Sequence, residues 1–248
     1  MNIIDLSSKK YIVTGAGSGI GRETAKVLSE QGARVVMLDL NQEGLEETLT
    51  SMKGSGHLYN VCDLSDFEAL SSLVEEVVEQ CGKIDGLVHC AGISSRKPLN
   101  MLKAKGFSKV MDVNFYSFVE LVRLATKKKN FNNGGSIVVM SSISSVRGYK
   151  AKSEYCVSKA AVDAFVRCMA LELADRKIRV NSVMPAEVLT PLAQKARKLN
   201  ESIGVANTDA PLGASDPYEI ANTIAFLLSD ATKTITGTSI LIDGGACI

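Results

Sequence analysis

Short apolar runs alternate with longer amphipathic segments along most of the chain. The short runs have the length and composition of buried strands, and the longer segments repeat apolar residues at helical spacing. The expected strands are Tyr11–Thr14, Val35–Leu38, Leu58–Val61, Gly86–His89, Ile137–Met140, Arg179–Val183 and Ser239–Ile242. The expected helices include Gly19–Glu30, Phe67–Gln80, Glu154–Ala174 and Pro217–Leu228. Apolar strands separated by helices predict an α/β fold, a doubly wound seven-stranded parallel sheet with helices on both faces.

Three irregular stretches interrupt this alternation. Gly54-Ser55-Gly56 and Asn132-Asn133-Gly134-Gly135 carry turn-forming residues directly before strands, so we expect turns there. The third stretch, around residues 186–215, is longer than the usual connection in a compact domain. A connection of that length is more often a lid or a binding element than a plain loop, so we expect a lid there.

Composition narrows the classes of function. The chain has 248 residues, 46% of them apolar, and a formal net charge of +1. This length is enough for one large α/β domain. A nucleic-acid-binding face would bring an excess of basic residues, and a membrane-spanning helix would need about 18 consecutive apolar residues. The sequence has neither pattern, so we expect no nucleic acid and no membrane among the partners.

Cysteine and histidine usage indicates a reducing compartment without a metal site. The six cysteines are scattered and form no C-x-x-C motif, which is typical of small side chains in a cytoplasmic protein. His57 and His89 are the only histidines, and neither has metal-ligand spacing around it. We therefore expect a cytoplasmic protein that holds no metal.

A glycine-rich turn follows the first expected strand and opens the first expected helix. Glycine lets the chain turn tightly and lets a pyrophosphate approach the backbone, and the free N–H groups at the helix start attract its charge. An ordinary strand–helix turn is the alternative, but the position in the first βαβ unit favours a dinucleotide site in a Rossmann-type sheet. The residues concerned are Gly15, Gly17, Ser18, Gly19, Ile20 and Gly21.

Asp39 closes the second expected strand, eighteen residues after Gly21. Its carboxylate can accept hydrogen bonds from both hydroxyls of an adenosine ribose, and it would repel a 2′-phosphate. No Arg or Lys follows in Leu40-Asn41-Gln42, so Asp39 favours NAD(H) over NADP(H), with helix capping as its alternative role. Asp63 follows the third strand and is placed to meet the adenine amino group, although it or Ser65 could instead cap the next helix.

Tyr155 and Lys159 stand four residues apart in a segment with helical periodicity, and Ser142 lies thirteen residues before Tyr155. Residues i and i+4 share a helix face, so an ammonium group lies one turn from a phenol. A phenol has a pKa of about 10, and a nearby cation favours its phenolate form. The pair therefore indicates proton exchange with an alcohol or carbonyl oxygen, although the same spacing occurs by chance on many helices.

These motifs together resemble the short-chain dehydrogenase/reductase family in its single-domain form, and the likeness covers nearly the whole chain. It implies one dinucleotide-binding and catalytic domain over residues 1–248, with a substrate lid around 186–215. The motifs that carry the likeness are Thr14–Gly21, Asp63, Ala91-Gly92, Asn114, Ser142, Tyr155-x-x-x-Lys159, Arg179–Val183, Pro185, Val188-x-Thr190-Pro191, Thr236-Gly237 and Asp243-Gly244-Gly245.

The resemblance implies a role for each matching residue. Tyr155 would be the general acid/base, and Lys159 would hold the nicotinamide ribose and bias Tyr155 toward phenolate. Ser142 would hydrogen-bond the substrate oxygen. Asn114 would hold a relay water behind Lys159, or it could merely bond the backbone of a kinked helix. With the glycine loop, the implied cofactor contacts are Asp39, Leu40, Asp63, Leu64, Cys90, Ala91, Gly92, Tyr155, Lys159, Pro185, Val188 and Thr190.

Two positions depart from the family pattern. His89-Cys90 stands where two asparagines are usual, so the hydrogen bonds of those side chains are lost or replaced. We expect His89 to find its partners inside the core. Pro185-Ala186 stands where Pro-Gly is usual, which restricts the backbone slightly. Neither departure removes a residue implied in the chemistry.

The resemblance implies an NAD(H)-dependent oxidoreductase that transfers a hydride between nicotinamide and a secondary alcohol or ketone. A 3-oxoacyl-carrier-protein reductase using NADPH is the close alternative, which Asp39 disfavours, and a catalytically silent NAD-binding scaffold is a remote one. Polar and charged residues near the expected pocket suggest a sugar, polyol or hydroxy acid as small-molecule substrate, unless they simply face water. The expected pocket residues are Ile93–Arg96, Ser144–Val146, Tyr149, Ala186-Glu187 and 191–211. A homotetramer packed through Ala104–Lys127 and Glu154–Ala174 is also implied.

Overall fold

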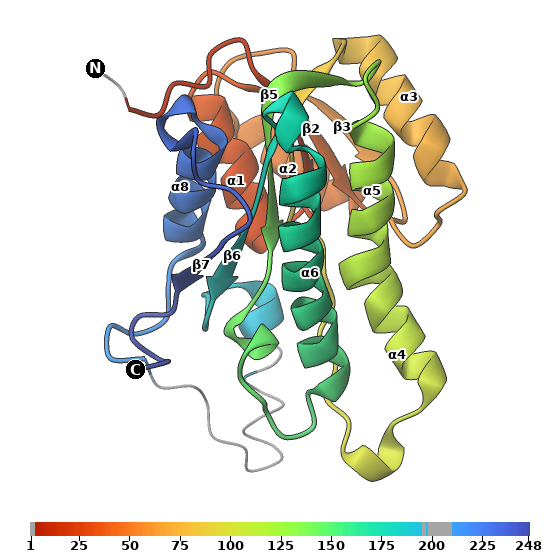
Figure 1. The fold of residues 1–248 in the computed structure, drawn as a ribbon, viewed down its shortest axis with the longest axis vertical. Coiled ribbons are helices and arrows are strands. Elements are labelled where there is room, and N and C mark those ends of the chain that lie inside the picture. The colour runs from red at the N-terminus through yellow and green to blue at the C-terminus, as the bar shows by residue number, and fades with distance from the viewer. Residues whose placement is uncertain (1–2, 195–196, 198–209) are drawn as a thin grey trace.

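A parallel seven-stranded sheet runs through the middle of the molecule (Figure 1). The computed structural model describes residues 3–194, 197 and 210–248. The strands lie in the order β3-β2-β1-β4-β5-β6-β7, and every neighbouring pair is parallel. Their bounds are β1 Lys10–Thr14, β2 Arg34–Asp39, β3 Leu58–Val61, β4 Ile84–His89, β5 Phe131–Met140, β6 Arg179–Pro185 and β7 Ser239–Ile242. The predicted doubly wound α/β sheet is confirmed.

Helices cover both faces of this sheet, as Figure 1 shows. One face carries α1 Gly19–Glu30, α2 Gln42–Ser51 and α8 Pro217–Leu228. The other carries α3 Ala69–Cys81, α5 Ser117–Ala125 and α6 Ser153–Glu172, and α4 Ala104–Met111 precedes α5. Short 3₁₀ turns lie at Leu99–Met101, Ile143–Ser145, Ala174–Arg176 and Asp230–Thr232. No described helix combines the length and hydrophobicity needed to cross a bilayer.

The two apolar layers follow from the alternation of side chains along buried strands. In β1, Ile12 points into the layer under α3, α5 and α6, whereas Tyr11 and Val13 point into the layer under α1, α2 and α8. All three side chains are at most 2% exposed. Because a central strand such as β1 is apolar on both faces, it can be covered on both, which is why its run lacks polar alternation.

The beginning of β5 corrects one expectation. The stretch Asn132-Asn133-Gly134-Gly135, predicted as a turn, belongs to β5. Asn132 donates a hydrogen bond to Asp85 across the β4–β5 pair (3.0 Å), and a Cβ on Gly135 would lie 2.4 Å from the Asp85 carbonyl oxygen. The pairing register shifts between Ile84 and Gly86. The glycines therefore accommodate an irregular strand start rather than a reversal of the chain.

A crevice forms where the connections diverge at the sheet centre. β1 pairs with β2 on one side and with β4 on the other. The chain therefore leaves the carboxyl end of β1 toward one edge and the carboxyl end of β4 toward the other, which separates the two loops. These strand ends point to the bottom of Figure 1. The fold thus predicts that a ligand site lies at this end of the sheet.

A buried arginine ties the end of α8 to the sheet. The Arg179 guanidinium, 6% exposed, donates hydrogen bonds to the carbonyl oxygens of Leu227 (2.6 Å) and Ser229 (3.1 Å) and to the Thr232 hydroxyl (2.8 Å). The carbonyls at the last turn of a helix lack intrahelical donors, and a cation also suits the negative end of the helix dipole.

We expect the substitution Arg179→Met to lower the free energy of unfolding by about 2–3 kcal/mol, because buried acceptors lose charged donors. The shift of the urea unfolding midpoint at fixed protein concentration measures this loss. The matched control is Arg123→Met, which removes an exposed ion pair with Glu120 and should cost less than about 0.5 kcal/mol. Equal midpoints for the two variants would contradict the role given to Arg179.

Candidate functional site

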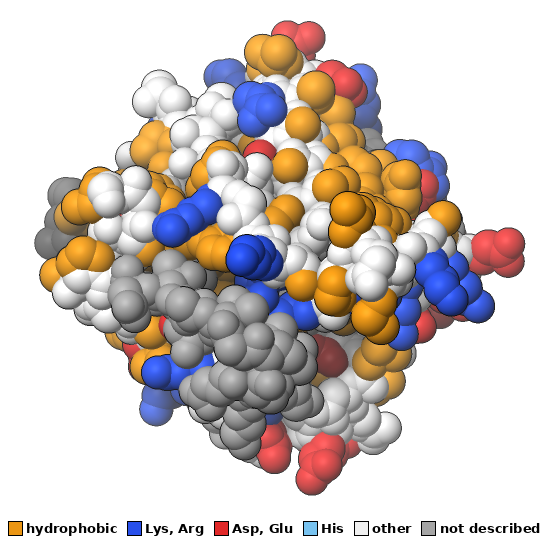
Figure 2. Space-filling view, turned by 90° about the horizontal axis from the view of Figure 1, so that it is seen from below, with side chains coloured by type: hydrophobic (Ala, Val, Ile, Leu, Met, Phe, Trp, Pro, Cys, Tyr) orange, Lys and Arg blue, Asp and Glu red, His pale blue; other side chains and the backbone are white. Residues whose placement is uncertain are grey.

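Two neighbouring cavities open at the carboxyl ends of the strands, the end of the molecule that faces the viewer in Figure 2. We call the first, of about 790 Å³, the glycine-loop cavity, and the second, of about 190 Å³, the tyrosine cavity. Of the predicted cofactor contacts, the glycine-loop cavity is lined by Gly15, Ser18, Gly19, Ile20, Gly21, Asp39, Leu40, Asp63, Leu64, Cys90, Ala91, Gly92 and Thr190. Of the other predicted contacts, Tyr155, Lys159, Pro185 and Val188 line the tyrosine cavity. Ser142, which the resemblance places against the substrate oxygen, lines it too. Ile20, Cys90, Gly92 and Thr190 line both, so the two cavities adjoin.

The glycine loop leaves a space that any side chain would fill. A Cβ on Gly21 would lie 2.1 Å from the Gly15 carbonyl oxygen, and a Cβ on Gly15 would lie 2.8 Å from the Ala91 nitrogen. Gly15 also has φ +67°, a conformation that other residues rarely adopt. The loop can therefore close only with glycine at these positions. Its backbone N–H groups then stand at the start of α1, where an anion such as a pyrophosphate is favoured.

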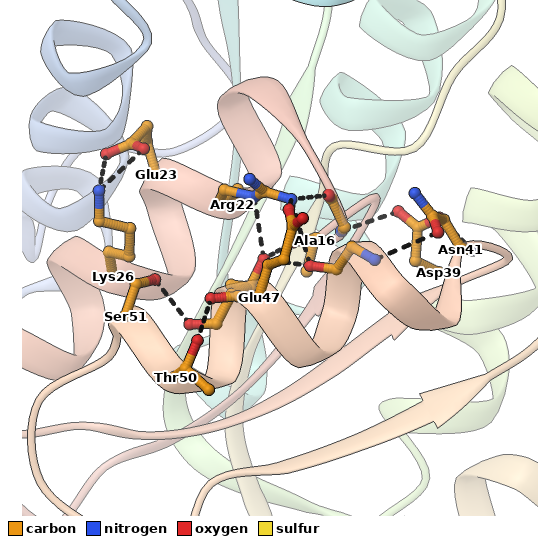
Figure 3. A network of polar contacts seen from close by, with 12 residues as sticks. Ala16, Arg22, Glu23, Lys26, Asp39, Asn41, Glu47, Thr50 and Ser51 are labelled. Carbon is orange, nitrogen blue, oxygen red and sulfur yellow. Dashed lines mark hydrogen bonds and ion pairs between the residues drawn. The ribbon is translucent and has the colours of Figure 1, made fainter.

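Arg22 fastens the back of this loop to α2, as Figure 3 shows. Its guanidinium donates hydrogen bonds to the Gly17 carbonyl (2.6 Å), the Thr48 hydroxyl (3.1 Å) and the Glu47 carboxylate (2.7 Å). This clamp was missed from the sequence, because the contacts with Thr48 and Glu47 join residues more than twenty positions apart and no spacing marks them. Arg22 is not among the lining residues of the glycine-loop cavity.

Asp39 lies in the wall of the glycine-loop cavity with its carboxylate held on two sides. One oxygen accepts the Gly17 N–H (2.9 Å) and the other accepts the Asn41 N–H (2.9 Å). The close approach explains why position 17 is a glycine, since a Cβ there would lie 2.9 Å from the Asp39 carboxyl carbon. Gly17 is the one predicted cofactor contact that lines neither cavity, because Asp39 covers it.

Asp63 also lines this cavity. We expected Asp63 or Ser65 to cap the next helix, but the two residues bond each other instead. Its carboxylate accepts hydrogen bonds from the N–H and the hydroxyl of Ser65 (2.9 and 2.6 Å), which hold the pKa of Asp63 below its usual value. Neither Asp63 nor Ser65 bonds the start of α3, where Asp66 instead accepts the Ala69 N–H (3.2 Å). The carboxylate of Asp63 therefore stays at the cavity wall.

His89 joins the ends of β1 and β4 inside the core, as expected. Its Nδ1 lies 3.0 Å from the Thr14 hydroxyl and its Nε2 lies 3.4 Å from the Ser117 hydroxyl. The same Thr14 oxygen accepts the Ala91 N–H (3.1 Å). Burial lowers the pKa of His89 to about 3, so its ring is neutral. The histidine thus supplies hydrogen bonds at a position where the family usually has asparagine. Its neighbour Cys90 has a thiol pKa raised by burial to about 12 and stays protonated.

Ser142 and Tyr155 meet in the wall of the tyrosine cavity. Ser142 begins a 3₁₀ turn and accepts the Ser144 N–H (3.1 Å), which fixes its hydroxyl. Desolvation raises the pKa of Tyr155 to about 12, and a hydrogen bond with Ser142 opposes the rise. The neighbouring Ser141 is turned away and donates to Asp163 (2.9 Å). The structure therefore brings together the pair of hydroxyls that the sequence interval selected.

Lys159 lies beside Tyr155, as the helical spacing predicts. Its ammonium donates to the Met140 carbonyl oxygen (2.7 Å) and lies 5.7 Å from the centre of the Tyr155 ring. The lysine is 3% exposed, and burial lowers its pKa to about 8. Desolvation is the main cause that raises the phenol pKa of Tyr155. The bias of Tyr155 toward phenolate that the resemblance implies for Lys159 stays a prediction.

A second missed residue, Asp163, stands one helical turn after Lys159. Its carboxylate accepts hydrogen bonds from the hydroxyls of Ser141, Ser182 (2.8 Å) and Ser239 (3.2 Å). It raises the pKa of Lys159 and so partly offsets the effect of burial. Asp163 shares the α6 face with Tyr155 and Lys159 at i+4 spacing, a signal that was present in the sequence.

Asn114 lies in a π-helix, Asp112–Tyr116, between α4 and α5. This bulge breaks the long helix expected over Ala104–Lys127, and such bulges are common at functional sites. The fully buried side chain accepts the Ile93 N–H (2.8 Å) and donates to the Ile93 carbonyl and the Ser158 hydroxyl (both 3.0 Å). Asn114 thus anchors the loop after β4. The relay water implied by the resemblance stays a prediction.

The expected substrate contacts are met in part. Ser94, Arg96, Ser144, Tyr149, Ala186 and Glu187 line the tyrosine cavity. Ser95, Ser145 and Val146 do not, and Ile93 lines the glycine-loop cavity instead. Lys152 lines the tyrosine cavity and was missed. Residues 195–196 and 198–209 of the expected lid lie outside the described residues. Within the described ranges, no cluster of three His, Cys, Asp or Glu side chains could hold a metal.

Known proteins resemble this chain along nearly its whole length. A family model described as Enoyl-(Acyl carrier protein) reductase matches residues 15–247. The 3-oxoacyl-(acyl-carrier-protein) reductase FabG of Thermotoga maritima is 34% identical, with 98% of this chain and 99% of that protein covered. The NAD-dependent glycerol dehydrogenase of Listeria innocua is 32% identical, with 98% and 96% covered. The solved short-chain dehydrogenase/reductase "Glucose/ribitol dehydrogenase" of Brucella melitensis has a TM-score of 0.90 at 30% identity, covering 99% of each chain.

We expect Gly21→Ala to abolish dinucleotide binding, because its Cβ would lie 2.1 Å from the Gly15 carbonyl oxygen and would force the loop open. The change in NADH fluorescence on binding, or calorimetric titration with NADH, measures this loss of binding. The matched control is Gly148→Ala, where an added Cβ meets nothing within 4 Å and φ is not positive. If both variants bind NADH like the unsubstituted protein, the glycine loop is not the binding element.

Proposed function

The chain belongs to the short-chain dehydrogenase/reductase family, and we propose that it is an NAD(H)-dependent oxidoreductase for a secondary alcohol and its ketone. Enzymes of this family act on CH–OH or carbonyl groups. The observation that carries the proposal is the meeting of the Ser142 and Tyr155 hydroxyls in a cavity that adjoins the glycine loop. Polar lining groups favour a sugar, a polyol or a hydroxy acid as the substrate class.

The glycine-loop cavity fits a dinucleotide on grounds of shape and charge. Its glycines leave room that a Cβ would fill, its volume of about 790 Å³ is in the range of cofactor sites, and its wall presents N–H groups at the start of α1. Asp39 would accept the ribose hydroxyls, and Asp63 would accept the adenine amino group. Thr190 and Val188 would hold the nicotinamide end, since both lie beside the tyrosine cavity.

The proposed chemistry at Tyr155 is proton exchange with the substrate oxygen. In oxidation, the phenolate form of Tyr155 would accept the O–H proton of the alcohol, while the hydride from its C–H bond would leave for the bound cofactor, so that a ketone results. Bound NAD⁺ would supply the hydride acceptor and a positive charge near Tyr155. Ser142 orients the substrate oxygen and stabilises the charge that develops on it. Lys159 holds its charge close to the nicotinamide ribose, and Asn114 keeps the loop after β4 in place.

Asp39 supports NAD(H) rather than NADP(H) as the cofactor. A carboxylate already fixed by Gly17 and Asn41 N–H groups would repel a 2′-phosphate. Arg22, the cation nearest in sequence to the loop, is engaged by Gly17, Thr48 and Glu47. The relative from Listeria innocua is named an NAD-dependent glycerol dehydrogenase, which fits this preference.

Two alternatives remain open to experiment. A 3-oxoacyl-carrier-protein reductase using NADPH is supported by the name of the Thermotoga maritima relative. It predicts a preference for NADPH, which Asp39 opposes. A catalytically silent NAD-binding scaffold predicts NAD binding without turnover of any alcohol, although Asn114, Ser142, Tyr155 and Lys159 are all in place.

We also propose a cytoplasmic homotetramer. All six cysteines are free thiols in the structure, which suits a reducing compartment. Exposed apolar side chains on α6, Val157 (48%) and Leu171 (81%), suit helix packing between copies. Light scattering of the purified protein measures the mass of the assembly.

We expect Tyr155→Phe to reduce kcat by at least about 10²–10⁴-fold, the usual contribution of a general acid/base, while NADH binding stays within about twofold. Phenylalanine keeps the ring and removes only the hydroxyl that exchanges the proton. NADH absorbance measures turnover and calorimetric titration measures binding. Undiminished turnover in Tyr155→Phe would exclude the mechanism. Loss of NADH binding would mean that the lower rate comes from weaker cofactor binding rather than from lost proton exchange.

We expect Asp39→Ser to raise the KM for NAD⁺ by about 10- to 100-fold, since hydrogen bonds to a charged group contribute about 1.5–3 kcal/mol. The KM for NADP⁺ should fall, because the repulsion of the 2′-phosphate is removed. Initial rates with both cofactors give the ratio of specificities. Asp66→Ser, which alters a carboxylate at the start of α3 outside both cavities, is the matched control. An unchanged NAD⁺/NADP⁺ ratio in Asp39→Ser contradicts the role of Asp39.

A further inference from the structure

The tyrosine cavity carries more positive than negative charge at its substrate end. Arg96, from the loop after β4, and Lys152, from the residue before α6, both line it. Among the described lining residues, Glu187 is the one carboxylate. Lys and Arg side chains also gather near the centre of the face in Figure 2. An excess of cations in a concave site favours an anionic ligand.

Arg96 is held at one end and open at the other. One terminal nitrogen donates to the Lys150 carbonyl oxygen (3.3 Å), which fixes the guanidinium. Its buried Nε has no hydrogen-bond partner among the described residues. Arg96 also forms no ion pair with a described carboxylate. A buried N–H without an acceptor is costly, so a ligand that supplies one is favoured. The Nε edge of a guanidinium suits the two oxygens of a carboxylate.

Lys152 lies between two aromatic rings at the edge of the reaction site. Its ammonium is 5.2 Å from the centre of the Tyr149 ring and 5.3 Å from the centre of the Tyr155 ring. It forms no ion pair with any described carboxylate at contact distance. Burial and the neighbouring Arg96 charge both lower the pKa of Lys152. A bound anion between the two cations would offset this repulsion.

Tyr149 adds a third group. Its buried hydroxyl also lacks a hydrogen-bond partner in the described part of the chain. The hydroxyl, the Arg96 Nε and the Lys152 ammonium thus belong to residues that line one cavity, and each can donate a hydrogen bond. Side chains that simply faced water would be solvated, whereas the atoms on Arg96 and Tyr149 are buried.

We propose that the substrate is a short hydroxy acid, or the matching oxo acid, whose carboxylate is bound by Arg96 and Lys152. The proposal rests on the oxidoreductase function proposed above and narrows its substrate class. Lys152 is close to the Tyr155 ring, so only a few bonds separate the carboxylate from the carbon that reacts. The cavity of about 190 Å³ suits a small molecule. The hydroxy acid loses a hydride to NAD⁺ and a proton to Tyr155, and its carboxylate is unchanged.

The first test compares acids with neutral partners of the same length. The full-length protein is assayed with NAD⁺ against 2-, 3- and 4-hydroxy acids of three to six carbons and against the amide of each. The best acid should exceed its amide in kcat/KM by about 10- to 100-fold, the effect of charged hydrogen bonds to one carboxylate. Equal values for acid and amide would overturn the proposal, and so would a preference for a phosphate ester such as glycerol 3-phosphate.

The second test removes each cation. Lys152→Met and Arg96→Met should each raise the KM for the best acid by about tenfold or more and lower the ratio of kcat/KM for the acid to that for its amide by a similar factor. Lys150→Met, which removes an exposed lysine two positions from Lys152 without altering the cavity lining, is the matched control. A merely structural role would lower the rates for acid and amide alike, which would overturn the proposal.

A binding measurement separates this inference from the proposed function. The Tyr155→Phe variant with NADH is expected to turn over too slowly to disturb a titration, so calorimetry with the oxo acids measures binding. We expect binding there and its loss in the double variant with Lys152→Met. If neutral alcohols are oxidised but no acid is bound or preferred, the substrate class is wrong and the oxidoreductase function stands. If oxo acids bind but no alcohol, acid or amide is ever oxidised, the carboxylate site stands and the oxidoreductase function fails.

Discussion

The close approach of β1 and β4 at their carboxyl ends is the constraint on which the site depends. Gly15 packs against the backbone of Ala91 so tightly that a Cβ would lie 2.8 Å from its nitrogen. Thr14 bonds both Ala91 and His89 across the same junction. Because the chain diverges from these two strand ends, the glycine loop and the loop that carries Arg96 become opposite walls of one crevice. A looser junction would separate the wall that suits a cofactor from the wall that suits a substrate.

Burial sets the electrostatics of the reacting groups in opposite directions. Desolvation raises the pKa of Tyr155 to about 12 and lowers the pKa of Lys159 to about 8. Both shifts favour the neutral forms, so the phenol of Tyr155 stays protonated and Lys159 loses its proton more readily than an exposed lysine. A positive charge in the adjoining cavity would favour phenolate, and Asp163 behind Lys159 opposes the loss of the lysine's proton. Proton exchange at Tyr155 is therefore expected to depend on what occupies both cavities.

Periodicity and glycine placement made much of the fold and site predictable. Strands apolar on both faces required a covered parallel sheet. No residue type other than glycine could occupy the tight positions of the loop before α1. The stretch before β5 misled because its asparagines and glycines are turn formers, whereas Asp85 supplies partners that keep it in the sheet. Arg22 and Lys152 were missed for a common reason. Spacing along the chain does not say whether a charged side chain faces water, a neighbouring loop or a cavity.

The two cavities divide the recognition between backbone and side chains. The glycine-loop cavity presents glycines and main-chain N–H groups, whose positions depend on the backbone rather than on neighbouring side chains. The substrate end is built from Arg96, Tyr149 and Lys152 on two loops, where substitution leaves the sheet untouched. Relatives of similar length are named for substrates as different as 3-oxoacyl-(acyl-carrier-protein) and glycerol. This difference is expected if specificity lies in such loops. Under the carboxylate site proposed above, the charge of this second wall, rather than the fold, would select the substrate.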